Sequence, residues 1–270
     1  MMAKRLLGAA LVLVIYIPIA IAGDWVFAVG LGIILAAALW EFLSILNPQI
    51  STFFQSIAVL CAFALTLARI LPGQLVFSAI LAACVCFLSA LALHVYRSNP
   101  QDAARQLVNA LAGLLLIPYL GGFMLSLRLL PDGLRWLLFT TAVTWSSDVG
   151  AYLLGSALGK YFLAPRLSPK KTWEGFAGGI LFAVLAGLAF ALIAGVLGSP
   201  FSLSSAAILA VSIALVSPLG DLVNSLIKRY CGIKDTGSLI PGHGGIFDRL
   251  DTLLWAAPLT YFLLVCFVWA

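Results

Sequence analysis

The chain has 270 residues, of which 63% are apolar and only 9% are charged, and its mean hydropathy is +1.13. Soluble domains are about 45–50% apolar and about 25% charged, so this composition excludes an ordinary soluble protein and predicts an integral membrane protein. The formal net charge of +5 does not indicate a nucleic-acid partner, because Lys and Arg in a multi-pass chain set its topology.

Apolar runs of bilayer-spanning length predict an all-α, polytopic fold with about nine transmembrane helices. Turn-forming residues separate several of these runs, for example Asn47-Pro48 and Pro72-Gly73. No polar linker interrupts the chain, which favours a single membrane domain over 1–270, with N-terminal helices in 1–130 and C-terminal helices in 134–270. The expected spans are 6–22, 25–46, 53–71, 74–95, 107–130, 134–157, 175–198, 202–227 and 252–270.

The first of these runs also has features of a signal peptide, with a cleavage-like sequence at Ala20-Ile21-Ala22. Its apolar stretch is longer than the usual 7–15 residues, which favours an uncleaved span. With the N-terminus in the cytoplasm, only Arg69, Arg128 and Arg135 of the 15 Lys and Arg residues fall on the outer side. The two large polar loops, 158–174 and 228–251, are then both predicted to be cytoplasmic.

Small residues recur at every fourth position of the expected span 175–198. Such a stripe lets helix backbones approach closely, so we expect close packing, either within the subunit or between subunits. The residues of the stripe are Gly175, Gly179, Ala183, Gly187, Ala191 and Gly195.

Acidic residues interrupt two apolar segments, Asp148 in the span 134–157 and Asp221 in the span 202–227. On a helix, Asp221 shares a face with Ser225 or Asn224 and with Lys228. An ionisable residue in or near the bilayer is costly, so both acids are predicted to be functional. Glu41 and His94, by contrast, stand near the ends of their spans and are expected to be interfacial.

The loop 228–251 concentrates charge and glycine. Asp248 and Asp251 share a helix face, although acids also simply favour a helix N-terminus. Glycine-rich backbone can close its N–H groups on an anion, and carboxylates with phosphate oxygens are typical ligands of Mg²⁺. The loop therefore suits a phosphate ligand held with a divalent cation. Its basic residues are Lys228, Arg229, Lys234 and Arg249, and Lys170 and Lys171 of the loop 158–174 either join them or only anchor the topology.

The segment "SLIKRYCGIKDTGSLIPGHGGIFDRLD", from Ser225 to Asp251, resembles the signature of the phosphatidate cytidylyltransferase (CDP-diacylglycerol synthase) family. Its fixed positions are S-x-x-K-R, K-D, P-G-H-G-G and D-R-x-D, and all are present. The stretch from Ser146 to Gly175 is similar to a second polar region of that family. One departure is Asn224, where members often carry Glu.

The resemblance implies the reaction of CTP with phosphatidate to give CDP-diacylglycerol and pyrophosphate. It also implies a multi-pass protein of the bacterial cytoplasmic (inner) membrane, a site that faces the cytoplasm, and a homodimer. Magnesium is the implied cofactor, as one ion, as two ions, or together with a monovalent cation. Asp221 and Asp248 would be the metal-binding acids.

Phosphoryl transfer depends on positioning and electrostatic stabilisation, so we expect acids and cations and no catalytic triad. The alternatives are a CTP-dependent polyprenol or lipid kinase, a cytidylyltransferase for another lipid phosphate, or an ion-coupled transporter with acidic sites. The expected catalytic residues are Asp221, Asp248, Lys228 and His243. The expected substrate-binding residues are Asp148, Lys170, Lys171, Glu174, Ser225, Arg229, Lys234, Asp235, Arg249 and Asp251.

Overall fold

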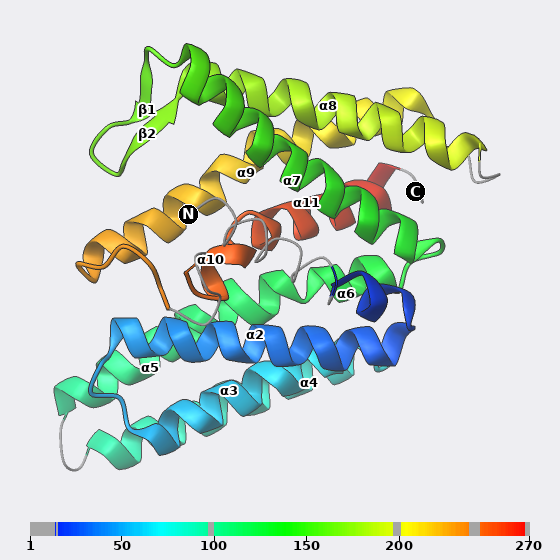
Figure 1. Cartoon of the computed structure of the whole chain (residues 1–270). Helices are drawn as coiled ribbons and strands as arrows, with labels where there is room; N and C mark the ends of the chain where they lie inside the picture. Colours follow the sequence, from blue (N-terminus) through cyan, green and yellow to red (C-terminus); the bar gives the residue numbers. More distant parts are fainter. Residues whose placement is uncertain (1–13, 15, 97–99, 197–200, 238–243, 268–270) are drawn as a thin grey trace. The chain divides into compact units, whose positions relative to one another are not determined.

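The computed structural model describes residue 14 and residues 16–96, 100–196, 201–237 and 244–267. Within these residues the chain consists of helices joined by turns and loops, with one small hairpin, which confirms the all-α prediction (Figure 1). It divides into two compact units, one made of 1–129 with 231–250 and the other of 130–230 with 251–270. The prediction of a single domain is not tested by this division and stays a prediction.

Seven helical segments of the described residues are long and apolar enough to cross a membrane, by length and composition. Each coincides with an expected span, and their bounds are 24–46, 52–70, 74–96, 100–128, 173–196, 203–230 and 247–266. The expected span 134–157 is also helical, but its Thr, Ser and Asp residues lower its hydropathy and it is not among the seven. The expected span 6–22, with its signal-like sequence, lies largely outside the described residues.

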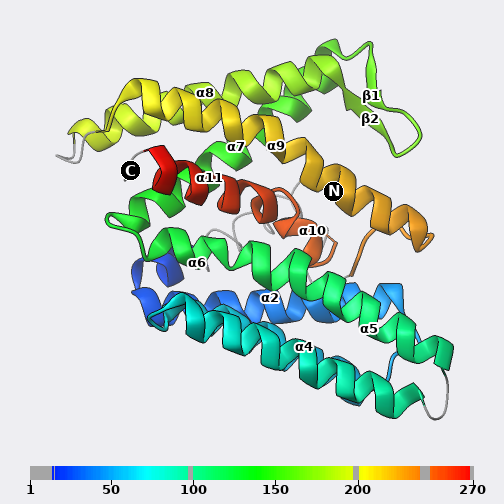
Figure 2. The same ribbon diagram turned by 180° about the vertical axis from the view of Figure 1, so that it is seen from behind.

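The first unit begins with three long helices whose ends follow the turn residues of the sequence. Gly23 and Gly73 have positive φ, of 119° and 96°, a backbone conformation that favours glycine, and each precedes a helix. Figure 2 shows the last of these three helices beside the helical segment that follows it in the chain. The three helices are α2 (Asp24–Leu46), α3 (Thr52–Leu67), which continues into the short η1 (Ala68–Ile70), and α4 (Gln74–Tyr96).

The fourth spanning segment of this unit is a helix interrupted in its middle. It consists of α5 (Pro100–Leu114), the π-helical turn η2 (Leu115–Tyr119) and α6 (Phe123–Arg128). Pro118 lies in the π turn, where its missing N–H cannot continue a regular helix. Gly113 lets α5 approach α2 closely, because a Cβ there would lie 3.1 Å from the ring of Phe42.

All three arginines assigned to the outer side make specific contacts inside their own units. Arg69 donates to the Ser126 hydroxyl and the Tyr119 carbonyl and lies over the ring of Phe123. Arg128 pairs with Asp24 at 2.9 Å, and Arg135 pairs with Asp132 at 3.0 Å. These contacts fix helix ends. The presence of the three arginines is therefore explained by structure, and no role in the reaction is needed to explain it.

The second unit is built on a packed pair of helices, α7 (Gly133–Leu158) and α8 (Trp173–Val196). A Cβ at Gly150 of α7 would lie 2.6 Å from the Gly178 carbonyl oxygen of α8, so the two backbones are nearly in contact. The small-residue stripe therefore packs within the chain: Gly179 faces Ser147 of α7, and Gly187 faces Ala210 of the next helix. This settles the open choice in favour of packing inside the subunit for these two positions.

A hairpin that the sequence did not predict joins α7 to α8. Its strands β1 (Phe162–Ala164) and β2 (Ser168–Thr172) pair antiparallel and extend beyond the adjoining ends of the two helices (Figure 1). The Thr172 hydroxyl accepts a hydrogen bond from the Gly175 N–H at 3.1 Å, which is an N-cap, so α8 starts at the end of the strand. Glu174 accepts a hydrogen bond from the Tyr161 N–H at 3.3 Å and ties the hairpin back to α8.

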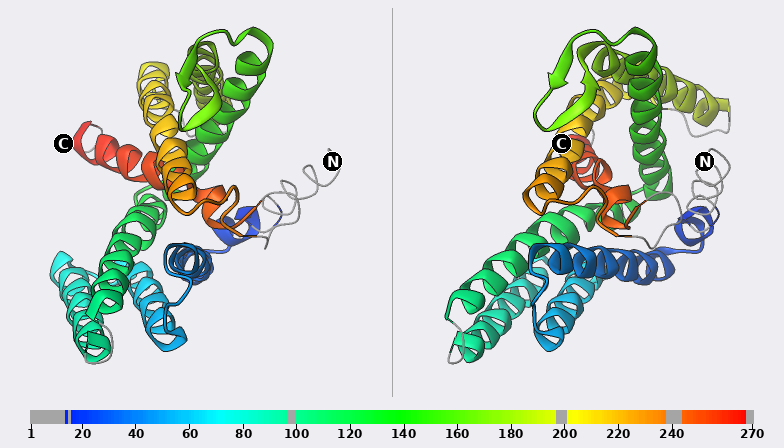
Figure 3. Two further views of the ribbon diagram at one scale, coloured as in Figure 1. Left: turned by 90° about the vertical axis from the view of Figure 1, so that its left-hand side faces the viewer. Right: turned by 60° about the vertical axis from the view of Figure 1, so that its left-hand side comes forward.

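The second unit is completed by α9 (Leu203–Tyr230) and α11 (Leu253–Phe267), which contact each other; Figure 3 shows them in two further views. The segment between them, Cys231–Leu250, belongs to the first unit and contains the short helix α10 (Phe247–Leu250), which contacts α2. Sequence reasoning had grouped this segment with the C-terminal helices. We call it the signature loop below.

Candidate active site

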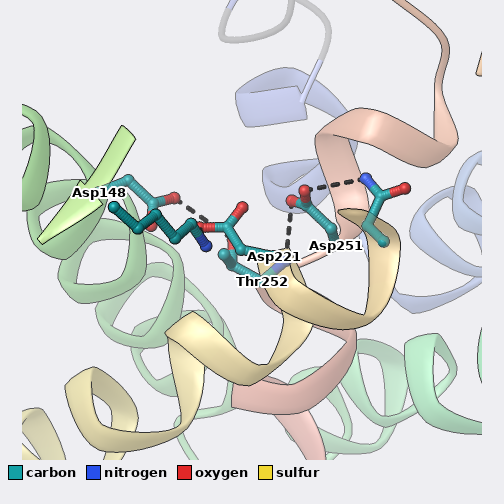
Figure 4. Close-up of polar contacts among 6 residues, drawn as sticks. Asp148, Asp221, Asp251 and Thr252 are labelled. Atoms are coloured by element: carbon teal, nitrogen blue, oxygen red, sulfur yellow. Dashed lines mark hydrogen bonds and ion pairs between the residues drawn. The ribbon is translucent and has the colours of Figure 1, made fainter. Parts of the chain in front are cut away.

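Three carboxylates from different parts of the second unit lie together in the structure. Asp148 comes from α7, Asp221 from α9, and Asp251 from the start of the segment that leads into α11 (Figure 4). Asp251 is close enough to Asp221 and Asp148 for the negative charges to act on one another. All three are half-buried. The two acids that interrupt apolar spans therefore do belong to one cluster, which we call the aspartate cluster.

A glycine explains why α9 can bring its acid so close. Gly220 precedes Asp221, and a Cβ at this position would lie 2.8 Å from the carbonyl carbon of Asp251. No other residue type fits without moving one of the two backbones. The close approach of α9 to residue 251 then places the Asp221 carboxylate beside that of Asp251.

Two further polar residues orient the cluster. Asn224, one turn after Asp221, is buried and donates from Nδ2 to Asp251 Oδ2 at 3.1 Å. Thr252 donates from its hydroxyl to Asp148 Oδ2 at 3.3 Å, and from its N–H to Asp251 Oδ1 at 2.9 Å. Sequence reasoning assigned no role to Thr252 and left Asn224 as a departure from a pattern. An amide at position 224 can donate to a carboxylate, which a Glu there could not do in its charged form.

One lysine reaches the cluster from the hairpin. Lys171 Nζ lies 2.6 Å from Asp221 Oδ2, with the two side chains 24% and 35% exposed. Lys170, its neighbour on β2, is exposed instead, as expected from the alternation of side chains along a strand. Of the two adjacent lysines, the structure therefore places only Lys171 at the acids.

The signature loop contains a separate carboxylate network in the first unit. Asp248 is buried, and its Oδ2 accepts hydrogen bonds from the Thr236 N–H and the Thr236 hydroxyl, both at 2.9 Å, and from the Gly245 N–H at 3.1 Å. Gly244 has a φ of 78°, and a Cβ there would lie 2.6 Å from Asp248 Oδ2. The carboxylate thus closes the loop by binding both of its arms.

Glu41 of α2 is part of this loop network, and the expectation that it is interfacial in the membrane stays a prediction. It is only 6% exposed, and its Oε2 accepts a hydrogen bond from the Phe247 N–H at 3.1 Å. The partner lies 206 residues further along the chain, so no local pattern near Glu41 could have revealed it. His94, which carried the same expectation, is exposed on α4.

Comparison with known proteins decides the family. A sequence profile described as the cytidylyltransferase family matches residues 3–267. The chain belongs to the cytidylyltransferase family.

Individual relatives agree with the profile over different lengths. A protein of Staphylococcus epidermidis (strain ATCC 35984) is 33% identical over 98% of this chain and 99% of its own length. One of Bacillus subtilis (strain 168) is 43% identical over 50% of this chain and 49% of its own length. One of Brucella suis biovar 1 is 46% identical over 53% of both chains. Each of these relatives is named phosphatidate cytidylyltransferase. As a cytidylyltransferase, the present protein is a nucleotidyltransferase.

The other predicted site residues of this cytidylyltransferase divide between the two units. In the second unit, Glu174 holds the hairpin, and Ser225, Lys228 and Arg229 lie in the last turns of α9. In the first unit, Lys234, Asp235 and Arg249 are exposed on the signature loop. His243 lies outside the described residues.

The chemistry of the donors fits a hard divalent cation, although the described residues contain no group of three or more His, Cys, Asp or Glu that is arranged to hold a metal ion. The aspartate cluster offers carboxylate oxygens, the ligands that Mg²⁺ prefers. The carboxylates of the cluster outnumber the one ammonium group of Lys171 that pairs with them, so a divalent cation would offset negative charge there. The expectation that Asp221 and Asp248 share an ion stays a prediction, because the two residues belong to separate units.

One cysteine, Cys231, stands at the start of the signature loop. Burial raises the pKa of the Cys231 thiol, so the thiol stays protonated at neutral pH.

Proposed function

We propose that this protein transfers a cytidylyl group from CTP to phosphatidate and produces CDP-diacylglycerol and pyrophosphate, a step of phospholipid synthesis. The observation that carries the proposal is the full-length relative, 33% identical over 98% of this chain and named phosphatidate cytidylyltransferase. The aspartate cluster supports it, because several acids beside one cation suit phosphoryl chemistry.

The reaction makes one bond and breaks one. A phosphate oxygen of phosphatidate attacks the α-phosphorus of CTP, and the bond from that phosphorus to the oxygen bridging the α- and β-phosphates breaks, so that pyrophosphate leaves with the bonding electrons. A phosphate monoester has a second pKa of about 6 and is already anionic at neutral pH. The protein therefore needs no strong general base, and its task is to hold two anions in line.

Asp148, Asp221 and Asp251 are the proposed acids of the site in the second unit. Bound Mg²⁺ would neutralise phosphate oxygens and stabilise the charge that develops during transfer. Asn224 and Thr252 hold the Asp251 and Asp148 carboxylates in fixed orientations. Lys171 limits the repulsion among the acids while no nucleotide is bound, and it is within reach of a phosphate that approaches Asp221.

The remaining assignments are made from the sequence. Asp248 is proposed as a second metal-binding acid and His243 as a hydrogen-bond donor to phosphate or to the leaving pyrophosphate. The basic residues Lys228, Arg229, Lys234 and Arg249 are proposed to neutralise the triphosphate and the lipid phosphate. Lys170, Glu174 and Ser225 are proposed to complete the substrate site, and Asp235 to orient the cations or to serve the metal.

The location of the site follows from where the substrates are. Exposing each CH₂ of a lipid chain to water costs about 0.8 kcal/mol, so phosphatidate stays in the bilayer, whereas CTP is confined to water. We therefore place the site at the cytoplasmic edge of the bacterial inner membrane, with the N-terminus also in the cytoplasm. A homodimer is proposed as well, on the family resemblance alone.

Replacing Lys171 by methionine should raise the KM for CTP at least about tenfold, because one phosphate contact and the counter-charge of Asp221 are lost together. A half-exposed ion pair that served stability alone would contribute only about 1 kcal/mol or less and would leave the KM unchanged. Steady-state kinetics on purified protein with phosphatidate would measure this. Arg166→Met removes an exposed positive charge from the turn of the same hairpin and is the matched control. An unchanged KM in Lys171→Met would remove the lysine from the substrate site.

The function is tested with purified protein in phosphatidate-containing vesicles and with CTP that is labelled at the α-phosphate in one experiment and at the γ-phosphate in another. We expect the α-label in the lipid product and the γ-label in pyrophosphate, with activity lost on chelation of divalent cations and restored by Mg²⁺. The γ-label in the lipid would instead identify a lipid kinase. Substrate-dependent flux across the vesicle without CTP turnover would identify a transporter.

A further inference from the structure

Glu41 is the one acidic residue of α2 apart from Asp24 at its first position, and it lies in the interior of the first unit. A carboxylate shielded from water is costly unless polar partners compensate it. An apolar residue would span the membrane more easily at this position. The presence of Glu41 therefore calls for a specific partner, and the structure provides one in the signature loop.

The side chain of Glu41 fits between the two arms of that loop. Oε2 accepts the Phe247 N–H at 3.1 Å, and a Cβ added at Gly237 would lie 2.6 Å from Oε1. Gly245 is equally close, since a Cβ there would overlap Oε2. Two glycines of the loop are thus required because the head of Glu41 occupies the space that their side chains would fill.

The neighbouring residue of α2 holds the same point of the loop. The Phe42 ring packs edge-to-face on the Phe247 ring, with centroids 5.5 Å apart. Phe247 is therefore fixed through its backbone by Glu41 and through its side chain by Phe42. The next residue in the chain is Asp248, whose carboxylate binds Thr236 and Gly245.

We propose that Glu41 is a positioning residue: as an acceptor for the Phe247 N–H, it fixes the signature loop so that Asp248 and the loop's cations are held ready for the substrates. Its effect on turnover rests on the proposed function, whereas its effect on the loop does not. What matters is an acceptor of the right shape between Gly237 and Gly245, more than the charge of the group.

Two variants of Glu41 distinguish the effect of its hydrogen-bond acceptor from the effect of filling the buried space with a side chain. Glu41→Gln keeps the length of the side chain and a carbonyl oxygen that can accept from Phe247, while Glu41→Leu keeps much of the apolar volume and removes the acceptor. Hydrogen–deuterium exchange followed by mass spectrometry, on substrate-free protein in lipid nanodiscs, reports on peptides that cover 232–250. We expect at least about tenfold faster exchange at Phe247 in Glu41→Leu and exchange within about threefold of wild type in Glu41→Gln.

Turnover is measured on the same samples. A displacement of about 1 Å at a reacting centre can cost about a hundredfold in rate, so Glu41→Leu should lose that much in kcat and Glu41→Gln should keep at least about a third of it. Gln55→Ala is the matched control, because Gln55 is a buried polar residue that hydrogen-bonds α2 at Trp40 and Ser44. It should lower the thermal stability and leave loop exchange unchanged.

The outcomes are distinct. Wild-type exchange at Phe247 in Glu41→Leu would overturn the proposal, and so would a loss in Glu41→Gln equal to that in Glu41→Leu, since the charge would then be the required property. If the wild-type protein itself makes no CDP-diacylglycerol, the proposed function fails, but the exchange data still decide on Glu41.

Discussion

Replacing Asp221 by asparagine should lower CDP-diacylglycerol synthesis at least about a hundredfold while the protein stays folded in the membrane. Asparagine has nearly the same size, so α9 can still approach Asp251 through Gly220. The substitution removes the charge that pairs with Lys171 and one of the three carboxylates of the cluster. Turnover of α-labelled CTP measures the loss of synthesis, and size-exclusion chromatography in detergent shows whether the protein stays folded.

Asp132→Asn is the matched control for this experiment. It makes the same chemical change in the same unit and also breaks an ion pair, that of Asp132 with Arg135 at 3.0 Å. Asp132 is exposed and has a φ of 53°, a conformation that asparagine tolerates as well, so turnover should stay within about twofold of wild type. Asp221→Asn with more than a tenth of the wild-type turnover would contradict the assignment of this acid to the site.

Two substitutions of Asp248 should distinguish its role as a hydrogen-bond acceptor that closes the loop from its role as a negative charge. Asp248→Ala leaves the Thr236 N–H, the Thr236 hydroxyl and the Gly245 N–H without their acceptor. Each buried donor left unsatisfied costs about 1–3 kcal/mol before the loop relaxes, so the melting temperature should fall by several degrees. Asp248→Asn retains an acceptor oxygen and should melt close to wild type.

Both Asp248 variants are nevertheless expected to be inactive, with turnover reduced at least about a hundredfold, because neither supplies the negative charge proposed to bind the metal. Thr236→Val removes only the hydroxyl donor and should cost no more than about tenfold. Recovery of turnover in Asp248→Asn would show that the carboxylate serves the loop alone, and the metal role of this residue would be abandoned.

The helices could be predicted from the sequence because a bilayer leaves the chain few choices. Backbone groups in lipid must bond within the segment, so an apolar run of about 20 residues is a helix whatever surrounds it. The seven spans of the structure match the expected ones for this reason. Asp148 and Asp221 could be singled out as candidate site residues on the same grounds, since an acid in an apolar helix needs a strong reason to be there, and the structure places them in one cluster.

The contacts of the aspartate cluster and those of Glu41 could not be predicted, because each joins distant parts of the chain. Asn224 meets Asp251 across 27 residues, Thr252 meets Asp148 across 104, and Phe247 meets Glu41 across 206. Residues of these types are common, and nothing in their local surroundings identifies the partner. The short β1–β2 hairpin escaped prediction because its residues were interpreted as a polar loop, in which Lys170 and Lys171 either join the site or anchor the topology.

The long separation in sequence between Glu41 and its partner Phe247 affects how the protein is inserted into the membrane during synthesis. When α2 leaves the ribosome and enters the bilayer, Phe247 has not yet been synthesised, so Glu41 is inserted with its helix before this hydrogen-bond partner exists. A charged group near the centre of an inserting helix costs about 2.5–3.5 kcal/mol, and the cost falls toward the ends. An 18-residue window of α2 has a mean hydropathy of 2.2, and these apolar residues offset the cost during insertion. Apolar residues of α2 that make no contact with the loop therefore help to deliver Glu41 to its place, and polar substitutions among them should reduce the yield of membrane-integrated protein.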